Sequence, residues 1–298
     1  MSIPKLSNGL RWPNIWVADV PEMFQPRKSP FRYPKYARDF GIEQDFLLFL
    51  RKSYPQTVNS PNEADFVYIP LFWTRYHLKN NFGSGGLQEL QAAVDEITAL
   101  GIPTFTVCQY DDGPLVRLDN CRIFLGSRKT QENLDAPLLA SRLPGRFVSN
   151  DSKFLFNFIG RVDTHPIRKE LVASVETLKS GFVSIGGVSA RHYSKILRQS
   201  EITLAPRGYG GSSFRFFEAI QAGSVPWLIG DIDSRPFKHQ IEWNEFSLYS
   251  RTVSEFLEQF EALSVPQMRL MRGRLNETLK PLLRLGNWNW LLIQELCE

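Results

Sequence analysis

The amino-acid sequence predicts an α/β protein built from two successive units, each with a parallel sheet covered by helices. Apolar runs typical of buried strands alternate with amphipathic stretches of helical period over most of the 298 residues. With 43% hydrophobic and 13% aromatic residues, the chain can bury two cores of ordinary size. The alternation is interrupted between residues 126 and 154 by a stretch rich in proline, charge and small residues. We therefore predict a domain boundary near residue 150, between units 1–150 and 151–298.

The elements expected in the first unit alternate in type along the chain. A strand is predicted for NIWVAD (14 to 19), a helix for EQDFLLFLRKS (43 to 53) and a strand, interrupted by Pro70, for DFVYIPLF (65 to 72). The segment GLQELQAAVDEITALG (86 to 101) has its apolar residues on one helical face and ends at a glycine, and the strand PTFTVC follows at once.

The second unit repeats this alternation. Strands are predicted for FLFNFIG (154 to 160), FVSIGG (182 to 187) and EITLAP (201 to 206), with the helical stretches HPIRKELVASVETLKSG and SARHYSKILRQS between them. Further helices are expected in TVSEFLEQFEAL, PQMRLMRGRLNETLKPLLRL and NWNWLLIQELCE, where Pro266 suits a first turn and Pro281 a kink or stop. We expect these terminal helices to leave one α/β unit and pack on the other.

Composition excludes several classes of protein. Thirty-five basic against 31 acidic residues leave a formal charge of +4, which does not predict nucleic-acid binding but is compatible with an anionic small molecule. The three cysteines are widely spaced and predict neither a disulfide framework nor a zinc site. No apolar stretch is long enough for a signal peptide or a transmembrane helix, so a soluble cytoplasmic protein is the expectation.

The segment EITLAPRGYGGSSFRFFEAIQAGSVPWLIGD (201 to 231) has the pattern of an anion site. A strand that ends in a glycine-rich loop and opens into a helix directs backbone N–H groups and the positive end of a helix dipole to one point. Gly208, Gly210 and Gly211 let the backbone approach an anion closely, while Ser212 or Ser213 can cap the helix and still offer a hydroxyl.

Three charged residues flank this loop. Arg207 follows the strand, Arg215 would lie in the first turn of a helix that starts near Ser213, and Glu218 would lie one turn further on the same face. Guanidinium groups bind phosphate oxygens, and a carboxylate can accept two ribose hydroxyls, so the spacing suits a nucleoside diphosphate. Alternatively, Arg215 and Glu218 form an ordinary surface pair, since the loop matches neither common phosphate-binding motif.

The segment PRGYGGSSFRFFEAIQAGSVPWLIGDIDSRPF closely resembles the carboxy-terminal signature of the exostosin-type glycosyltransferases: PRG, then SxRxxEA, a glycine-containing turn before Val-Pro, an Asp, and a Pro-Phe pair. NIWVADVPEMF, TVNSPNEADFVYIPLFW and IEWNEFSLY resemble other blocks of the family in the right order, so the resemblance covers most of residues 14 to 275. Two positions depart from the family pattern: Ala205 replaces its usual cysteine, and Ser224 replaces the cysteine before Val-Pro.

The resemblance implies a GT-B architecture, with two facing Rossmann-like domains, a cleft between them and C-terminal helices packing back. It implies an inverting transfer of sugar from a nucleotide-sugar donor, expected to be UDP-linked, to a hydroxyl of a growing glycan. The second domain would bind the donor and the first the acceptor, and neither a metal nor another cofactor is expected. The alternative is a catalytically inactive nucleotide-sugar-binding partner of another glycosyltransferase.

By this resemblance, Arg207 and Arg215 would bind the diphosphate, Glu218 the ribose, and the backbone of Gly208 to Ser213 the distal phosphate. Arg161, directly after FLFNFIG, is either a further phosphate ligand or a solvent-facing turn residue.

The catalytic base is expected among the acids that follow a strand of the first unit. Asp111 and Asp112 lie directly after PTFTVC, where they would face a ligand at the carboxyl edge of the sheet. Asp112 is marginally preferred, and the other acid is assigned to turn formation beside Gly113.

Other polar and aromatic residues are assigned mainly to packing. Asp231 and Asp233 match the DxD pattern of metal-dependent glycosyltransferases but are interpreted as a chance match. The histidines have no ligand spacing, although His165 is close enough in sequence to Arg161 to reach the donor. Four aromatic residues are candidates for stacking on a sugar but could equally be core residues: Trp73, Tyr76, Trp288 and Trp290.

Overall fold

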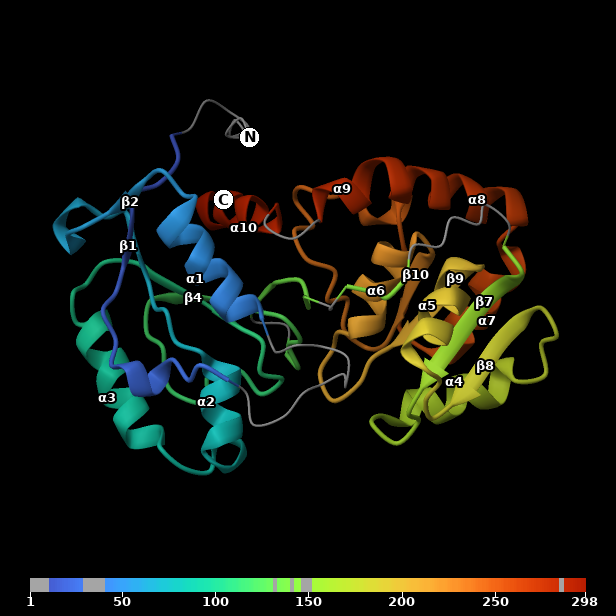
Figure 1. Cartoon of the computed structure of the whole chain (residues 1–298), viewed down its shortest axis with the longest axis horizontal. Helices are drawn as coiled ribbons and strands as arrows, with labels where there is room; N and C mark the ends of the chain where they lie inside the picture. The colour runs from blue at the N-terminus through green and yellow to red at the C-terminus, as the bar shows by residue number, and fades with distance from the viewer. Residues whose placement is uncertain (1–10, 29–40, 131–132, 140–141, 146–151, 284–286) are drawn as a thin grey trace. The chain divides into compact units, whose positions relative to one another are not determined.

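The computed structural model describes residues 11–28, 41–130, 133–139, 142–145, 152–283 and 287–298. The chain divides into two compact units (Figure 1). The first comprises Met1–Arg128, Glu132–Pro137 and Leu285–Glu298, and the second Lys129–Gln131 and Leu138–Arg284. The predicted boundary near residue 150 lies outside the described residues. The chain passes from the first compact unit to the second earlier, around residues 128–138, and its last residues belong to the first unit again.

The first unit contains a six-stranded sheet in the order β2-β1-β3-β4-β5-β6, in which every pair is parallel. Its strands are β1 (Ile15–Val17), β2 (Thr57–Val58), β3 (Phe66–Tyr68), β4 (Thr104–Cys108), β5 (Cys121–Leu125) and β6 (Leu134–Asp135). β4 is buried at all its positions, as expected for a central strand with helices on both sides.

The helices of the first unit are α1 (Ile42–Lys52), α2 (Trp73–Lys79), α3 (Leu87–Thr98) and α10 (Trp288–Cys297), with the 3-10 turns η2 (Glu22–Phe24), η3 (Pro61–Glu63) and η4 (Asn81–Gly83). α3 buries Leu90, Val94 and Ile97, the predicted apolar face. The predicted return of the terminal helices is confirmed for α10 (Trp288–Cys297), which belongs to the first unit, whereas the helices between Val253 and Leu282 stay in the second unit. There the indole of Trp288 donates to Asp45 at 3.1 Å.

The second unit contains a five-stranded parallel sheet in the order β11-β10-β9-β7-β8. Its strands are β7 (Phe154–Gly160), β8 (Gly181–Ile185), β9 (Ser200–Pro206), β10 (Val225–Ile229) and β11 (Leu248–Ser250). The chain leaves β7 toward β8 on one side, and β9 lies on the other side of β7. The strand order therefore reverses between β7 and β9, and ligands of open α/β sheets bind at such a point, outside the carboxyl ends of the strands.

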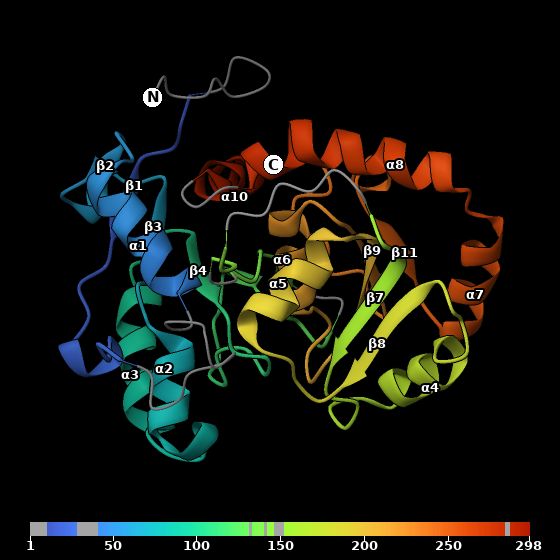
Figure 2. The same ribbon diagram turned by 45° about the vertical axis from the view of Figure 1, so that its right-hand side comes forward.

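The helices of the second unit are α4 (Pro166–Val175), α5 (Ala190–Arg198), α6 (Phe214–Ala222), α7 (Val253–Ala262), α8 (Val265–Arg274) and α9 (Lys280–Leu282), with the 3-10 turn η5 (Trp243–Glu245) and the π-helical turn η6 (Leu275–Leu279). The core between the sheet and one layer of helices contains Leu171 of α4, Phe256 of α7 and Met268 of α8. α5 and α6 pack together on the other face (Figure 2). Both the alternation and the α/β class predicted from sequence are confirmed.

Candidate functional site

The glycine-rich loop of residues 207–213 leaves the carboxyl edge of the second sheet from its middle strand, β9. α6 starts at Phe214 with Ser213 as its N-cap, as predicted, although the Ser213 hydroxyl makes no capping hydrogen bond. Gly208, Gly210 and Gly211 all lack a positive φ, so an unusual turn does not explain them. Gly208 allows a close approach instead, because a Cβ there would lie 3.3 Å from Nη2 of Arg168. Five residues of the loop are buried: Arg207, Gly210, Gly211, Ser212 and Ser213.

Arg207 is anchored at the carboxyl end of β9. Its backbone N–H donates to the carbonyl of Ile229 at 2.9 Å, and its guanidinium forms an ion pair with Asp231. The aliphatic part of its side chain lies against Gly230, where a Cβ would come within 3.0 Å. Partial burial acts to raise the pKa of Asp231, but the hydrogen bond and the charge of Arg207 outweigh it and hold that pKa below its usual value.

Arg215 reaches from the first turn of α6 across the end of β7. Its Nε donates to the carbonyl of Ile159 at 2.5 Å, and its guanidinium lies 5.2 Å from the centre of the Phe158 ring. A Cβ on Gly160 would lie 1.7 Å from Nη2 of Arg215, so only glycine leaves room for the guanidinium. Glu218 is buried, so the alternative of a surface pair between Arg215 and Glu218 is wrong.

Glu218 lies one turn further along α6 and is only 2% exposed. The hydroxyl of Tyr193, on α5, donates to its Oε2 at 2.5 Å. The contact orients one carboxylate oxygen of the residue predicted to bind ribose. Tyr193 was not identified from the sequence, because it lies on a different helix, 25 residues earlier.

Arg168 was also missed, and it joins the ends of β7 and β9. This buried side chain, in the first turn of α4, donates to the carbonyls of Arg207 at 2.7 Å, Pro206 at 3.0 Å and Arg161 at 3.1 Å. Because the N–H groups of its guanidinium bind three backbone carbonyls, Arg168 acts as a positioning residue that fixes the start of the glycine-rich loop.

Arg161 lies as expected for a solvent-facing turn residue. Its side chain is 58% exposed and forms an ion pair with Asp163, with N to O distances of 2.9 and 2.5 Å. Binding of phosphate by Arg161 stays a prediction.

The two acids of the DxD match bind different arginines. Asp231 binds Arg207, whereas Asp233 accepts two hydrogen bonds of 2.9 Å from Arg235. Each carboxylate is therefore engaged by its own guanidinium, which disfavours joint binding of a cation. The expectation that the site needs no metal remains a prediction.

In the first unit, Asp111 and Asp112 lie where they were predicted, in a turn directly after β4. The turn is closed by the Gly113 N–H, which donates to the carbonyl of Tyr110 at 2.9 Å. Asp111 is half-buried and Asp112 is exposed. Both lie at the carboxyl edge of the first sheet, the edge at which open α/β sheets bind their ligands.

A third acid, Glu43, lies near the same strand end and was not identified from the sequence. It is 1% exposed at the start of α1, and its Oε1 accepts hydrogen bonds from the Gln109 N–H at 2.9 Å and from the Thr74 hydroxyl at 2.7 Å. It thereby ties α1 to the start of α2 and to the segment that leads into Asp111. Burial raises the pKa of Glu43 to about 7, against the opposing effect of these hydrogen bonds.

We expect this raised pKa to make stability fall with increasing pH. The unfolded chain releases the Glu43 proton near pH 4.5, whereas the folded chain holds it until about pH 7. Folding stability is therefore lost between these values, by about 3 kcal/mol, and changes little above them. Glu43→Gln should abolish this part of the pH dependence. Urea unfolding of both proteins from pH 4.5 to 8 measures the difference, and parallel stability curves would contradict the prediction.

Most of the aromatics considered for sugar stacking belong to the core. Trp73 and Trp288 are fully buried and Tyr76 is 3% exposed, while the half-buried Trp290 packs edge-on against Trp12. The packing interpretation is therefore correct for these residues. In contrast, Tyr209 of the glycine-rich loop is 62% exposed.

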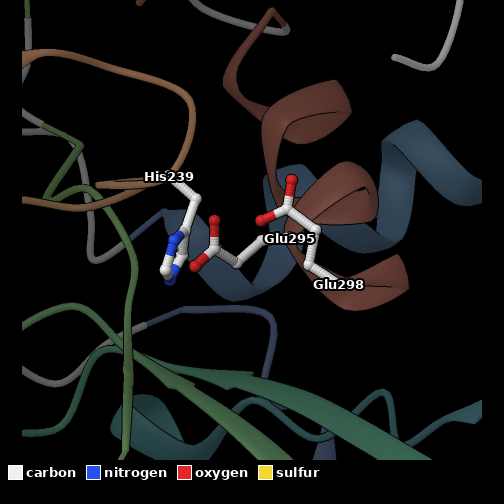
Figure 3. Close-up of side chains that lie close together, drawn as sticks. All are labelled: His239, Glu295 and Glu298. Atoms are coloured by element: carbon white, nitrogen blue, oxygen red, sulfur yellow. The ribbon is translucent and has the colours of Figure 1, made fainter. Parts of the chain in front are cut away.

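Figure 3 shows a histidine and two glutamates that belong to different units. Glu295 and Glu298 are at the end of the chain in the first unit, and His239 is in the second. Because the three residues do not share one compact unit, no metal site is inferred from them.

None of the helices in the described residues is long and apolar enough to span a membrane.

Comparison with known proteins finds similarity to one family over the segment that contains the glycine-rich loop. Residues 128–254 match the Exostosin GT47 domain. The chain is 33% identical over 82 residues to an exostosin-1 homolog of Caenorhabditis elegans, covering 28% of this chain and 20% of that protein. It is 28% identical over 123 residues to exostosin-1 of Drosophila melanogaster, covering 34% of this chain and 16% of the relative. The matched part thus spans a fifth or less of these relatives' length.

Solved structures resemble the chain more distantly. TarM has a TM-score of 0.35 and 9% identity, covering 64% of this chain and 54% of TarM. The GtfA/B complex has a TM-score of 0.34 and 14% identity, covering 78% of this chain and 46% of the matched chain. At this level of similarity neither structure adds to the assignment.

Two successive α/β units with parallel sheets, and a loop of anion-binding type at the carboxyl edge of the second, define a protein of GT-B-like fold. Within that class the chain is exostosin-like: residues 128–254 match the Exostosin GT47 domain, and the similarity to exostosin-1 relatives supports the predicted family. The facing of the two units across a cleft stays a prediction.

Proposed function

We propose that the protein is an inverting glycosyltransferase that transfers a sugar from a nucleotide-sugar donor to a hydroxyl of a glycan acceptor in polysaccharide synthesis. The donor is proposed to be UDP-linked, bound by the second unit, and the acceptor to be bound by the first. The observation that carries the proposal is the position of Arg215: its guanidinium lies across the end of β7, where the strand order reverses, next to the glycine-rich loop.

This arrangement suits a leaving group that becomes more negative during the reaction. As the bond from the anomeric carbon to the distal phosphate breaks, charge accumulates on the nucleoside diphosphate. Arg207, Arg215 and the N–H groups at the start of α6 are fixed before the reaction, so they would stabilise this charge without reorganisation. Glu218, oriented by Tyr193, would accept hydrogen bonds from the ribose.

Inversion requires a base that takes the proton of the acceptor hydroxyl as its oxygen attacks the anomeric carbon opposite the leaving phosphate. Asp112, with Asp111 as the second candidate, would take that proton. The exposure of Asp112 favours it, because a base has to reach the acceptor from the surface of the first unit.

The proposal is tested by release of free nucleotide from a panel of UDP-, GDP- and CMP-sugars, with and without EDTA and with candidate glycan acceptors. We expect turnover of a UDP-sugar that survives EDTA, because arginines and backbone N–H groups supply the positive charge. Loss of turnover in EDTA would contradict the metal-free mechanism. Binding of a nucleotide with no turnover of any donor would favour the inactive-partner alternative.

A further inference from the structure

The turn between β7 and α4 lies against the glycine-rich loop. Arg168 fixes it there, since this one side chain binds carbonyls of both segments: Arg161 in the turn, and Pro206 and Arg207 at the start of the loop. The two segments come close at Gly208, where an added Cβ would lie 3.9 Å from the hydroxyl oxygen of Thr164. Thr164 therefore borders the segment proposed to bind the distal phosphate.

Two buried polar atoms in this region have no hydrogen-bond partner within the described part of the chain: Oγ1 of Thr164 and Nε of Arg207. Arg207 is 7% exposed. Its Nη1, and not its Nε, donates the hydrogen bond to the carboxylate of Asp231. Buried polar groups are almost always satisfied, because an unpaired one costs free energy in the folded state. Both atoms can donate a hydrogen bond, so a single kind of ligand atom, an acceptor oxygen, would satisfy both.

The charges around the turn favour an anionic ligand. His165, the N-cap of α4, accepts a hydrogen bond from the Ile167 N–H through Nδ1 at 3.3 Å and lies near Arg207, Arg168 and Asp231. Partial burial, followed by the positive charge of Arg207, lowers the pKa of His165, while Asp231 acts in the opposite direction. With the Arg161–Asp163 pair of the turn included, three arginines outnumber two carboxylates, so the net local charge is positive.

We infer that Thr164 is a phosphate-binding residue of the donor site, and that its hydroxyl and Nε of Arg207 donate to the distal phosphate of the bound nucleoside diphosphate. The inference rests on the proposed function and adds a phosphate-binding residue from outside the glycine-rich loop. It also accounts for two buried donors that have no partner among the described residues, because phosphate oxygens would accept from both.

The test uses Thr164→Val, which keeps the shape of the side chain and removes the hydroxyl. Because that hydroxyl has no hydrogen-bond partner among the described residues, the variant should unfold at the same temperature as the wild type or at a higher one. Its affinity for UDP should fall about 10-fold or more, as for a lost hydrogen bond to a charged group. Its affinity for UMP, which lacks the distal phosphate, should not change. Thr164→Ser should restore UDP binding.

Thr203→Val is the matched control. The Thr203 hydroxyl is buried in the same unit but bonded to Asn157 and to Ser224, each at 2.8 Å, so this variant should lose stability. A Thr164→Val protein that is destabilised like Thr203→Val, or that binds UDP as tightly as the wild type, would overturn the inference while leaving the proposed function intact. A wild-type protein that binds no UDP would overturn both.

Discussion

Arg215→Ala is expected to lower kcat/KM for the nucleotide-sugar by about 10²- to 10³-fold, the usual effect of removing one preorganised donor from a developing charge. The residue is already held by the Ile159 carbonyl and by the Phe158 ring, so its fork of N–H groups is oriented before the donor binds. Arg215→Lys should recover only part of the rate, because an ammonium cannot bind the carbonyl and two phosphate oxygens in the same geometry. The kcat/KM of the wild type, Arg215→Ala and Arg215→Lys is measured from the release of nucleotide from the active donor.

Gly160→Ala tests the position of the guanidinium while keeping its charge. The new Cβ would lie 1.7 Å from Nη2 of Arg215 and must displace it, so activity should fall toward that of Arg215→Ala. Gly187→Ala is the control, since a Cβ at Gly187 meets no atom within 4 Å. Wild-type kcat/KM in folded Arg215→Ala protein, checked by circular dichroism, would show that the diphosphate does not bind at this strand end.

Replacing both Asp111 and Asp112 by asparagine is expected to lower sugar transfer by about 10²- to 10⁴-fold, the range for loss of a general base. Asparagine preserves the size of both side chains but cannot take a proton from the acceptor hydroxyl at neutral pH. The affinity for UDP should be unchanged, because the residues predicted to bind it belong to the second unit. Transfer to glycan and equilibrium binding of UDP are measured separately, and the single variants identify which acid is the base.

Asp119→Asn is the matched control for this pair. Asp119 is an exposed acid between the same two strands, β4 and β5, and its carboxylate is paired with Arg117 at 3.1 Å. The control should retain wild-type transfer. Full activity in the Asp111→Asn, Asp112→Asn double variant would contradict the assignment of the base to this turn.

Much of the second unit follows from local sequence pattern. The apolar run of β9, the glycine-rich loop and the N-cap position of Ser213 are all encoded within about a dozen consecutive residues, and each lies where it was predicted. α2 was not predicted, because its seven residues are mostly buried and show no amphipathic pattern. The two-residue strands β2 and β6 are too short to give a periodic signal.

The sequence by itself therefore determined the α/β class, the main strands and helices, the exostosin-like signature and the segment that carries Arg207, Arg215 and Glu218. Only the tertiary structure decided what these side chains contact. Arg168 meets the Arg207 carbonyl across 39 residues of chain, Tyr193 meets Glu218 across 25, and Glu43 meets Gln109 across 66. The first and third pairs form because strands distant in sequence end at one edge of a sheet, and the second forms because α5 packs on α6. No local sequence pattern determines which polar groups meet in these places.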